Sequence, residues 1–272
     1  MFNVNLNMKM KKFVLSVLLL ASLLRVDMLF AWGGKGHDVV AYIAEQHLTS
    51  RARKAVSEIL DGKSMVYYAS WMDNIQNSPD WEGGYDKTKT WHYINVDAGK
   101  TLATMEREPK GDVLTATEAS IAALRSGNLS DSLKADHLKM LIHMIGDMHC
   151  PMHAGRKTDL GGNQFAVKWF GAETNLHSVW DSKFIESYRT WSHTEWQVQL
   201  DRVSRKEQKA IMAGTPLDWT LETVDISKAI YAGTVEGANL SYQYLYDFGP
   251  LCEEQLLKGG LRLAAVLNEI FK

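Results

Sequence analysis

Residues 141–181 read LIHMIGDMHCPMHAGRKTDLGGNQFAVKWFGAETNLHSVWD and hold four of the nine histidines of this 272-residue chain. His143 is followed four residues later by Asp147. His177 is followed four residues later by Asp181. Residues four apart share one face of a helix, so each pair can direct an imidazole nitrogen and a carboxylate oxygen at one point. Zinc takes such ligands, usually about four per ion. With His153 between the pairs, the stretch predicts more than one metal ion.

A single pair of this kind also has a simpler interpretation, a hydrogen bond at the surface or in the core. His143 lies in an otherwise apolar run, residues 138–145, where a lone histidine is typical of a packed core. Asp147 favours the metal, because a buried carboxylate without a cation or hydrogen-bond donors is costly.

Residues 1–31 have the pattern of a secretory signal segment. Three lysines between residues 9 and 12 precede the apolar run 13–24, and Ala31 ends the segment. The apolar run is shorter than the roughly 20 residues that span a membrane. We expect cleavage after Ala31 and a secreted or periplasmic domain, residues 32–272, with no stable membrane insertion. An uncleaved membrane anchor is the alternative.

Residues 32–272 are enough for one domain with a sizeable core. The full chain has 30 Lys and Arg against 32 Asp and Glu, and the first 31 residues hold four of these basic residues and one of the acidic ones. A protein that binds phosphates through its own charge alone is basic. If this chain binds phosphates, metal cations must supply much of the attraction.

The two cysteines, Cys150 and Cys252, are too few for a disulfide scaffold. A secreted location permits them to pair. Cys150 lies between His149 and His153, so it is either a zinc ligand or an unpaired core residue, and both interpretations stay open.

Hydrophobic periodicity predicts a mainly helical fold. Gly33, Gly34 and Gly36 are expected to form a turn before a first helix, and Ser50 to cap the second. The predicted helices cover residues 39–48, 50–60, 114–124, the segment after Ser130 or Asp131 that carries His143, the segment after Asn175 that carries His177, and residues 195–213, 217–232, 237–247 and 251–271. Residues 164–170 are expected to form a short strand after the turn at Gly161, Gly162 and Asn163.

Three further residues are candidate metal ligands. Removal of Ala31 would give Trp32 a free amine, and an amine and its own carbonyl can chelate a metal with His37 nearby. Asp73 follows Trp71, and His92 stands in the run WHYIN. Taken alone, Asp73 is also interpretable as a surface acid and His92 as a packed core histidine.

The motifs, in order along the chain, resemble those of the S1/P1 nuclease family. They are WGxxGH, WxD, WHxIN, HxxxDxHxPxHxG, GGN, NLHxxWD and KGGxRLAxxLNEI, and they run from Trp32 to the C-terminal helix. Members of this family are secreted, zinc-dependent single-strand nucleases and 3'-nucleotidases. The resemblance implies a mainly α, single-domain bundle of helices with few short strands and a trinuclear zinc site in a cleft.

The resemblance also implies a ligand set for three zinc ions. The first would bind Asp73, His92, His143 and Asp147. The second would bind His153, His177 and Asp181. The third would bind the amine and carbonyl of Trp32 together with His37, and Asp147 would bridge it to the first.

The expected reaction is cleavage of single-stranded RNA or DNA to 5'-phosphonucleotides, with 3'-nucleotidase activity. A water shared by two zincs would lose its proton near neutral pH and attack phosphorus, because zinc lowers the pKa of bound water to about 7. Asp73 and Asp147 would be the catalytic carboxylates. No obligate protein partner is expected.

Tyr93, Asn95 and Asn163 are candidate substrate-binding residues. Tyr93 stands where the family has an aromatic ring that stacks on a base, although core packing would also explain it. Asn163 would contact phosphate or support its own turn. The chain departs from the family at Asn95, where some members have a base-contacting aspartate, and at Gln76, where some have a basic residue. These changes leave zinc binding intact and affect substrate range.

Two other functions stay open. A zinc phospholipase C has a related fold and also begins with a zinc-binding tryptophan. A secreted zinc-binding protein without activity would keep the ligands and lose the reaction.

Overall fold

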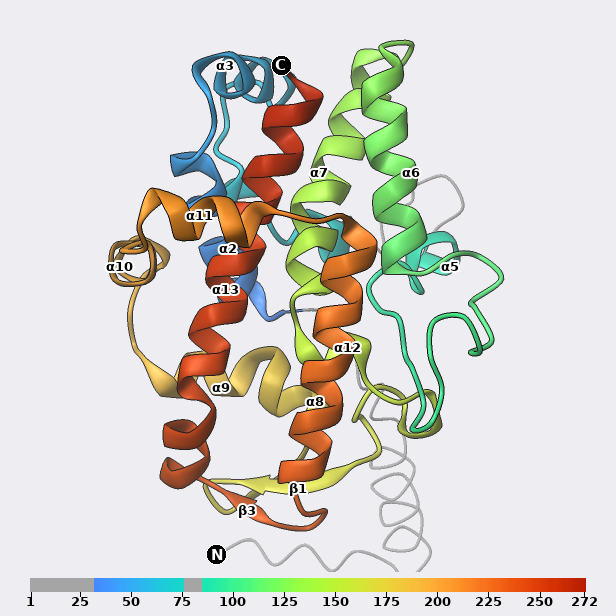
Figure 1. The fold of residues 1–272 in the computed structure, drawn as a ribbon, viewed down its shortest axis with the longest axis vertical. Coiled ribbons are helices and arrows are strands. Elements are labelled where there is room, and N and C mark those ends of the chain that lie inside the picture. Colours follow the sequence, from blue (N-terminus) through green and yellow to red (C-terminus); the bar gives the residue numbers. More distant parts are fainter. Residues whose placement is uncertain (1–31, 76–84) are drawn as a thin grey trace, which may run out of the picture. The chain divides into compact units, whose positions relative to one another are not determined.

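The computed structural model describes residues 32–75 and 85–272 (Figure 1). The predicted signal segment 1–31 and Gln76 lie outside this range. The prediction of a mainly α fold is confirmed. Within these residues no helix is long and apolar enough to span a bilayer. The longer helices are α2 (Gly34–Gln46), α3 (Ser50–Ile59), α6 (Val113–Ser126), α7 (Asp131–Met148), α10 (His193–Leu200), α11 (Arg205–Met212), α12 (Pro216–Gly233) and α13 (Tyr242–Ile270).

Short helical turns connect the long helices. They are η1 (Val66–Tyr68), α4 (Trp71–Asn74), α5 (Tyr85–Thr88), η3 (Pro151–Ala154), η4 (Lys157–Asp159), α8 (Leu176–Ser178), η5 (Val179–Lys183) and α9 (Phe184–Tyr188). Three strands form one small sheet. β1 (Ala166–Trp169) pairs antiparallel with β2 (Ala172–Asn175), with Ala166 opposite Asn175, and parallel with β3 (Asn239–Leu240).

Helix α13 is one continuous helix of 29 residues, which corrects the prediction of two helices, 237–247 and 251–271. Pro250 lies inside it, although proline removes one backbone hydrogen bond and usually ends a helix. Buried residues precede and follow Pro250, so packing on both sides outweighs this local loss. Residues 239–240 of the first predicted helix form β3 instead.

Helix α7 crosses the interior, and every residue from Met140 to Met148 is buried. Its end is held by Arg262 of α13, a buried side chain with three partners. The Arg262 guanidinium donates to the carbonyl of Ile211 at 3.0 Å and to Nε2 of His149 at 3.0 Å, and it pairs with Glu222 at 2.5 Å. Because His149 follows α7 directly, this contact fixes the end of the helix that carries Asp147.

Side-chain caps set most helix starts, and they correct two boundaries. Thr49, and not Ser50, caps α3 by accepting from the amide of Ala52. The predicted helix 195–213 divides into α10 and α11, because Ser204 caps a new helix by accepting from the amide of Glu207. Of the two candidates for α7, Ser130 is the cap.

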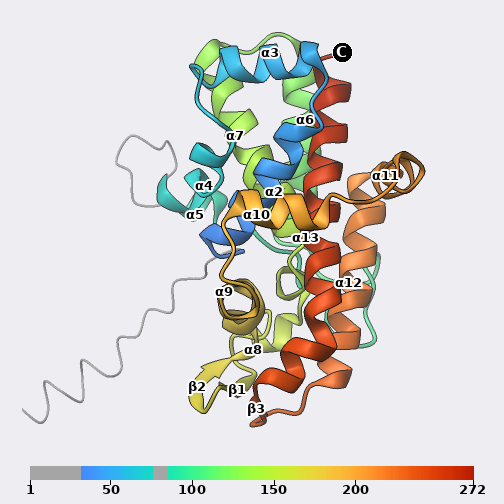
Figure 2. The same ribbon diagram turned by 90° about the vertical axis from the view of Figure 1, so that its left-hand side faces the viewer.

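Helices α2 and α13 are in close contact through glycine (Figure 2). A Cβ on Gly260 would lie 2.5 Å from Cβ of Ile43, an atom attached directly to the α2 backbone. Gly260 therefore permits the close packing of α13 on α2. Helix α2 in turn packs on α7 and carries His37 at its start. Gly34 and Gly36 were expected in a turn but lie within α2.

We expect Gly260→Ala to destabilise the protein. Overpacking typically costs about 1–3 kcal/mol, whereas alanine at an unconstrained helical site gains about 0.5–1 kcal/mol over glycine. Urea unfolding measures the difference. Gly34→Ala is the control, since its Cβ would meet only Oγ of Ser70 at 3.5 Å. A Gly260→Ala midpoint at or above that of the wild type would contradict this packing.

Candidate metal centre

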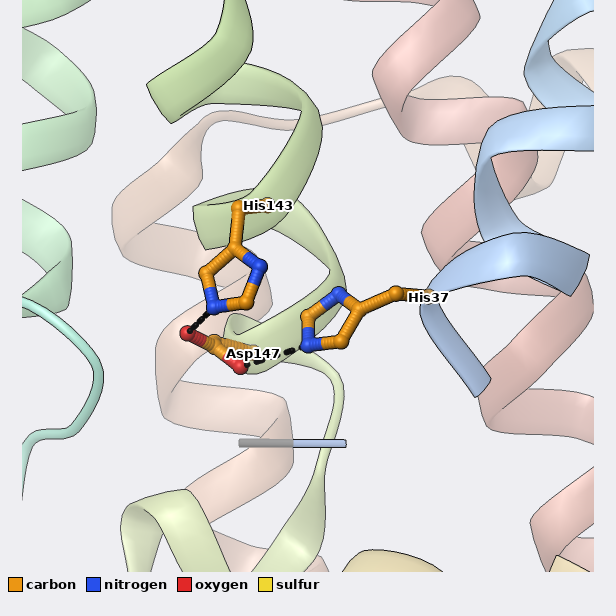
Figure 3. Close-up of side chains that lie close together, drawn as sticks. All are labelled: His37, His143 and Asp147. Carbon is orange, nitrogen blue, oxygen red and sulfur yellow. Dashed lines mark ion pairs between the residues drawn. The ribbon is translucent and has the colours of Figure 1, made fainter. Parts of the chain in front are cut away.

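The carboxylate of Asp147 lies at the middle of the site. Asp147 and His143 are fully buried on α7, and the helical spacing brings Nε2 of His143 to 3.2 Å from Oδ2 of Asp147. Figure 3 shows that His37, from α2, points at the other oxygen of the same carboxylate, 3.3 Å from Oδ1.

Two further imidazoles reach Asp147 from other segments. Nδ1 of His92 lies 3.1 Å from Oδ2, and Nδ1 of His153 lies 3.4 Å from Oδ1. Four histidine nitrogens therefore lie within 3.4 Å of one buried carboxylate. Like charges oppose one another in so small a volume, so the imidazoles cannot all be protonated to neutralise it.

Asp73 adds a second carboxylate to this side of the centre. It lies on α4, with Oδ1 3.5 Å from Nε2 of His143 and 3.6 Å from Nδ1 of His92. Single ligand atoms of Asp73, His92 and His143 all lie within 4.8 Å of one another, and those of His37, His143 and Asp147 do so as well.

Backbone carbonyls orient three of the histidines. Nδ1 of His143 donates to the carbonyl of Ala69 at 2.8 Å. Nδ1 of His153 donates to the carbonyl of His92 at 2.6 Å, and Nδ1 of His177 to that of Gly161 at 2.8 Å. A proton held at Nδ1 leaves the Nε2 lone pair as the ligand atom, which is the usual outer contact of metal-binding histidine.

The segment with His177 and Asp181 differs from the predicted α-helix. Three residues of α8 lead into the π-helical turn η5, which contains Asp181. In a π-turn the hydrogen bonds run from i to i+5, so four-residue spacing no longer places side chains directly above one another. His177 instead stacks on His153, with ring centroids 5.2 Å apart, and Oδ1 of Asp181 lies 3.7 Å from Nε2 of His153.

Cys150 is the third member of the group formed by His153 and Asp181, since their ligand atoms lie within 4.8 Å of one another. Cys150 and Cys252 are both free and buried. Burial and the neighbouring carboxylate of Asp181 hold the pKa of the Cys150 thiol well above its usual value. With so high a pKa the Cys150 thiol keeps its proton and is neutral.

Trp32 is buried at the start of the described chain. Its ring packs on Gly36, where a Cβ would come within 2.7 Å of the indole. The amide of Gly33 donates to the carbonyl of Asp181 at 2.6 Å. The backbone next to Trp32 is thus hydrogen-bonded to the π-turn that carries a predicted ligand.

Burial and close charges shift the pKa values of several side chains at the centre. Burial, followed by His143, lowers the pKa of His37 to about 4. Burial also disfavours the charged form of His143, but Asp147 and Asp73 outweigh it and hold the His143 pKa well above its usual value. Burial raises the pKa of Asp181 well above its usual range despite His177. Metal binding at His143 and Asp181 must therefore displace protons.

Many buried polar atoms at the centre have no hydrogen-bond partner among the described residues. They are Nδ1 and Nε2 of His37, Oδ1 of Asp73, Nε2 of His92, Oδ1 of Asp147, Nε2 of His153 and Oδ1 of Asp181. Buried polar groups are normally paired, and imidazole nitrogens with carboxylate oxygens form a donor set that suits zinc. The residues present therefore fit divalent cations.

The S1/P1 nuclease family model matches residues 32–272. The chain belongs to the S1/P1 nuclease family.

Relatives along the whole chain agree with this assignment. The chain is 28% identical to Endonuclease 5 of Arabidopsis thaliana, over 96% of this chain and 97% of the relative. It is 26% identical to Nuclease S1 of Aspergillus oryzae, over 92% and 95% of the two chains, and 26% identical to Nuclease P1 of Penicillium citrinum, over 88% and 97%. This S1/P1 family member is a hydrolase that acts on the ester bonds of nucleic acid.

The three candidate substrate-binding residues of this S1/P1 nuclease lie on two loops. Residues 93–97 lie outside the helices and strands, and the amide of Ile94 donates to the carbonyl of His153 at 2.7 Å. Tyr93 and Asn95 alternate with the buried His92, and Oδ1 of Asn95 is buried without a hydrogen bond among the described residues. The Asn163 amide donates to the carbonyl of Leu160 at 2.8 Å, so it supports its own turn. Their roles in binding stay predictions.

Sequence reasoning missed the residues that hold the ligands. The carbonyls of Ala69 and Gly161 leave no trace in the residue type. Gly146 had a usable signal, because it is a glycine inside a helix between two candidate ligands. A Cβ there would lie 2.7 Å from Nδ1 of His37, so only glycine lets that ring reach Asp147.

We expect zinc to stabilise the wild type strongly and Asp147→Asn weakly. A ligand at a thousandfold excess over its Kd adds about 4 kcal/mol, or roughly 8–16 °C in Tm for a chain of this size. Asn keeps the shape and removes the charge that all four imidazoles approach, so most of this rise should disappear. Differential scanning fluorimetry with zinc and with chelator measures it.

Asp225→Asn is the matched control, an exposed aspartate on α12 that pairs with Lys228. It should keep the full zinc-dependent rise. An equal rise in Asp147→Asn would show that Asp147 is not part of the metal site.

Proposed function

We propose that this chain is a secreted, zinc-dependent nuclease that cleaves single-stranded RNA or DNA to 5'-phosphonucleotides and also removes 3'-phosphates from nucleotides. One observation carries the proposal. Four imidazoles converge within 3.4 Å of the buried Asp147 carboxylate. An arrangement of this kind is stable at neutral pH when cations share the ligands.

We assign the three zinc ions to the ligand sets implied by the family resemblance. The geometry supports the first set through the contacts among Asp73, His92, His143 and Asp147. His153 and Asp181 support the second. The Cys150 sulfur lies within 4.8 Å of ligand atoms of His153 and Asp181, so this buried thiol is either a further ligand of the second set or a core residue packed beside it.

When bound, zinc ions supply the Lewis acidity that neutralises a phosphodiester and lowers the pKa of water to about 7. The protein's own residues provide position and proton balance. Asp147 and Asp73 both approach Nε2 of His143, with carboxylate oxygens 3.2 and 3.5 Å away. Carbonyls hold protons at Nδ1 of His143, His153 and His177, so that Nε2 faces the site. No side chain has to act as the nucleophile.

Removal of residues 1–31 completes the third set in this proposal. Support comes from the burial of Trp32, the hydrogen bond from Gly33 to Asp181, and the family match that begins at residue 32. The freed amine of Trp32 would then chelate metal together with His37, whose Nε2 lies 3.3 Å from the second oxygen of Asp147.

The substrate is single-stranded nucleic acid or a nucleotide, with Tyr93, Asn95 and Asn163 as its proposed contacts. Stacking on a tyrosine tolerates any base and is worth about 1–3 kcal/mol. The phospholipase alternative loses support, because the relatives reported above are named nucleases or endonucleases. The non-catalytic alternative requires a protein that keeps every ligand and has no activity.

We expect the wild type to degrade single-stranded DNA and RNA and to dephosphorylate a 3'-nucleotide, and a chelator to abolish all three activities. Zinc should restore them. Loss of an outer partner of a metal ligand costs about 10–100-fold, so Asp147→Asn should lose at least about 100-fold in kcat/KM. Asp225→Asn should stay fully active. Undiminished activity in chelator, or hydrolysis of choline lipids alone, would contradict the proposal.

We expect the secreted protein to begin at Trp32. N-terminal sequencing of the exported protein measures this directly. A mature chain that starts at another residue would remove the terminal amine from the metal site and leave the other two ligand sets intact.

A further inference from the structure

Aromatic and basic side chains form a surface strip beside the metal centre. The strip consists of Lys63, Tyr67, Tyr68, Trp71 and Lys139. The Lys63 ammonium lies over the Tyr67 ring, 5.0 Å from its centroid, and the Lys139 ammonium lies over the rings of Tyr68 and Trp71 at 5.0 and 4.7 Å. The rings of Tyr67 and Tyr68 meet edge to face at 4.9 Å.

The strip and the metal centre are built on the same segments of the chain. Ala69 follows Tyr68 directly, and its carbonyl accepts from Nδ1 of His143. Asp73 follows Trp71 by two residues on α4, and α4 packs on α7 (Figure 2). Lys139 precedes His143 by one helical turn of α7. A chain bound at the centre could therefore continue onto the strip.

Exposure and charge distinguish the strip from ordinary core packing. Tyr67 is 67% exposed, although a tyrosine ring can bury a large area. Lys139 lies 3.6 Å from Asp136 on its own helix, which neutralises part of its charge. Lys63 is exposed and forms no ion pair with a carboxylate among the described residues. The strip thus presents a largely exposed tyrosine ring next to a lysine that has no ion pair within 4 Å among the described residues.

This combination suits one class of ligand. Single-stranded nucleic acid offers unpaired base faces for stacking and phosphates for lysine, and proteins bind it through aromatic side chains within a basic surface. In a duplex the bases are stacked on one another and cannot reach the tyrosine.

We propose that the strip binds single-stranded nucleic acid outside the metal centre, with Tyr67 stacking on a base and Lys63 contacting phosphate. The inference rests on the proposed nuclease function for its substrate. It makes the enzyme prefer long strands to dinucleotides, because only a long strand reaches both the centre and the strip.

The first test compares kcat/KM for a single-stranded oligothymidylate with kcat/KM for a dinucleotide. The oligothymidylate has about 20 nucleotides, which exceeds the roughly 4–16 nucleotides that one single-strand-binding domain typically covers. Loss of one stacked base in Tyr67→Ala should lower the ratio of long to short about fivefold to tenfold. Tyr246→Ala is the control, since Tyr246 is 79% exposed on α13. It should leave the ratio at the wild-type value.

The second test measures binding without cleavage, by fluorescence anisotropy of a labelled phosphorothioate oligothymidylate with the zinc-loaded protein. Tyr67→Ala should weaken binding about fivefold to tenfold. Lys63→Ala should reduce the slope of log Kd against log salt by about 0.7, the value for one phosphate contact on a single strand.

An unchanged ratio and an unchanged Kd in Tyr67→Ala would overturn the inference, and so would an equal loss on both substrates, which would indicate damage to the metal centre. If the wild type cleaves no substrate yet binds the oligothymidylate through Tyr67 and Lys63, the proposed function is wrong and the strip stands. If the wild type cleaves single strands but neither Tyr67→Ala nor Lys63→Ala changes cleavage or binding, the proposed function stands and the strip proposal is wrong.

Discussion

A carboxylate shared by four imidazoles is the constraint on which the rest of the structure depends. Asp147 is fully buried, and nitrogens of His37, His92, His143 and His153 lie within 3.4 Å of it. Burying an anion costs several kcal/mol unless it is well paired. The imidazoles cannot all become cations in so small a space, so protonation alone cannot neutralise the carboxylates of this centre. Bound metal ions would resolve this conflict, and folding and metal binding would then be parts of one equilibrium.

The surrounding helices are arranged to hold these groups at fixed distances. Gly260 lets α13 approach α2, and Gly146 lets the ring of His37 lie against α7. Arg262 joins α13 to His149, two residues beyond Asp147. Loop carbonyls from Ala69, His92 and Gly161 orient three histidines. The short loops and turns thus position the ligand atoms, and the long helices exclude water from them.

The sequence predicted the features whose signal is local or periodic. The helix with His143 and Asp147 follows from apolar periodicity, and the family motifs pointed to Asp73 and His92 on distant segments. Tertiary packing decided the features that were missed. Pro250 continues through α13 because both flanks are buried, and residues 179–183 wind as a π-turn that four-residue spacing could not reveal. The proximity of Cys150 to Asp181 depends on that turn. Carbonyl contacts have no sequence signal, since every residue has a carbonyl.

The most direct test of this metal centre is anomalous X-ray diffraction at the zinc edge from crystals of the mature protein. We expect separate zinc peaks between Asp147 and His37, among Asp73, His92 and His143, and beside His153 and Asp181. Crystals that contain zinc only at surface sites, with Asp147 still surrounded by metal-free imidazoles, would contradict the claim that cations stabilise this buried carboxylate.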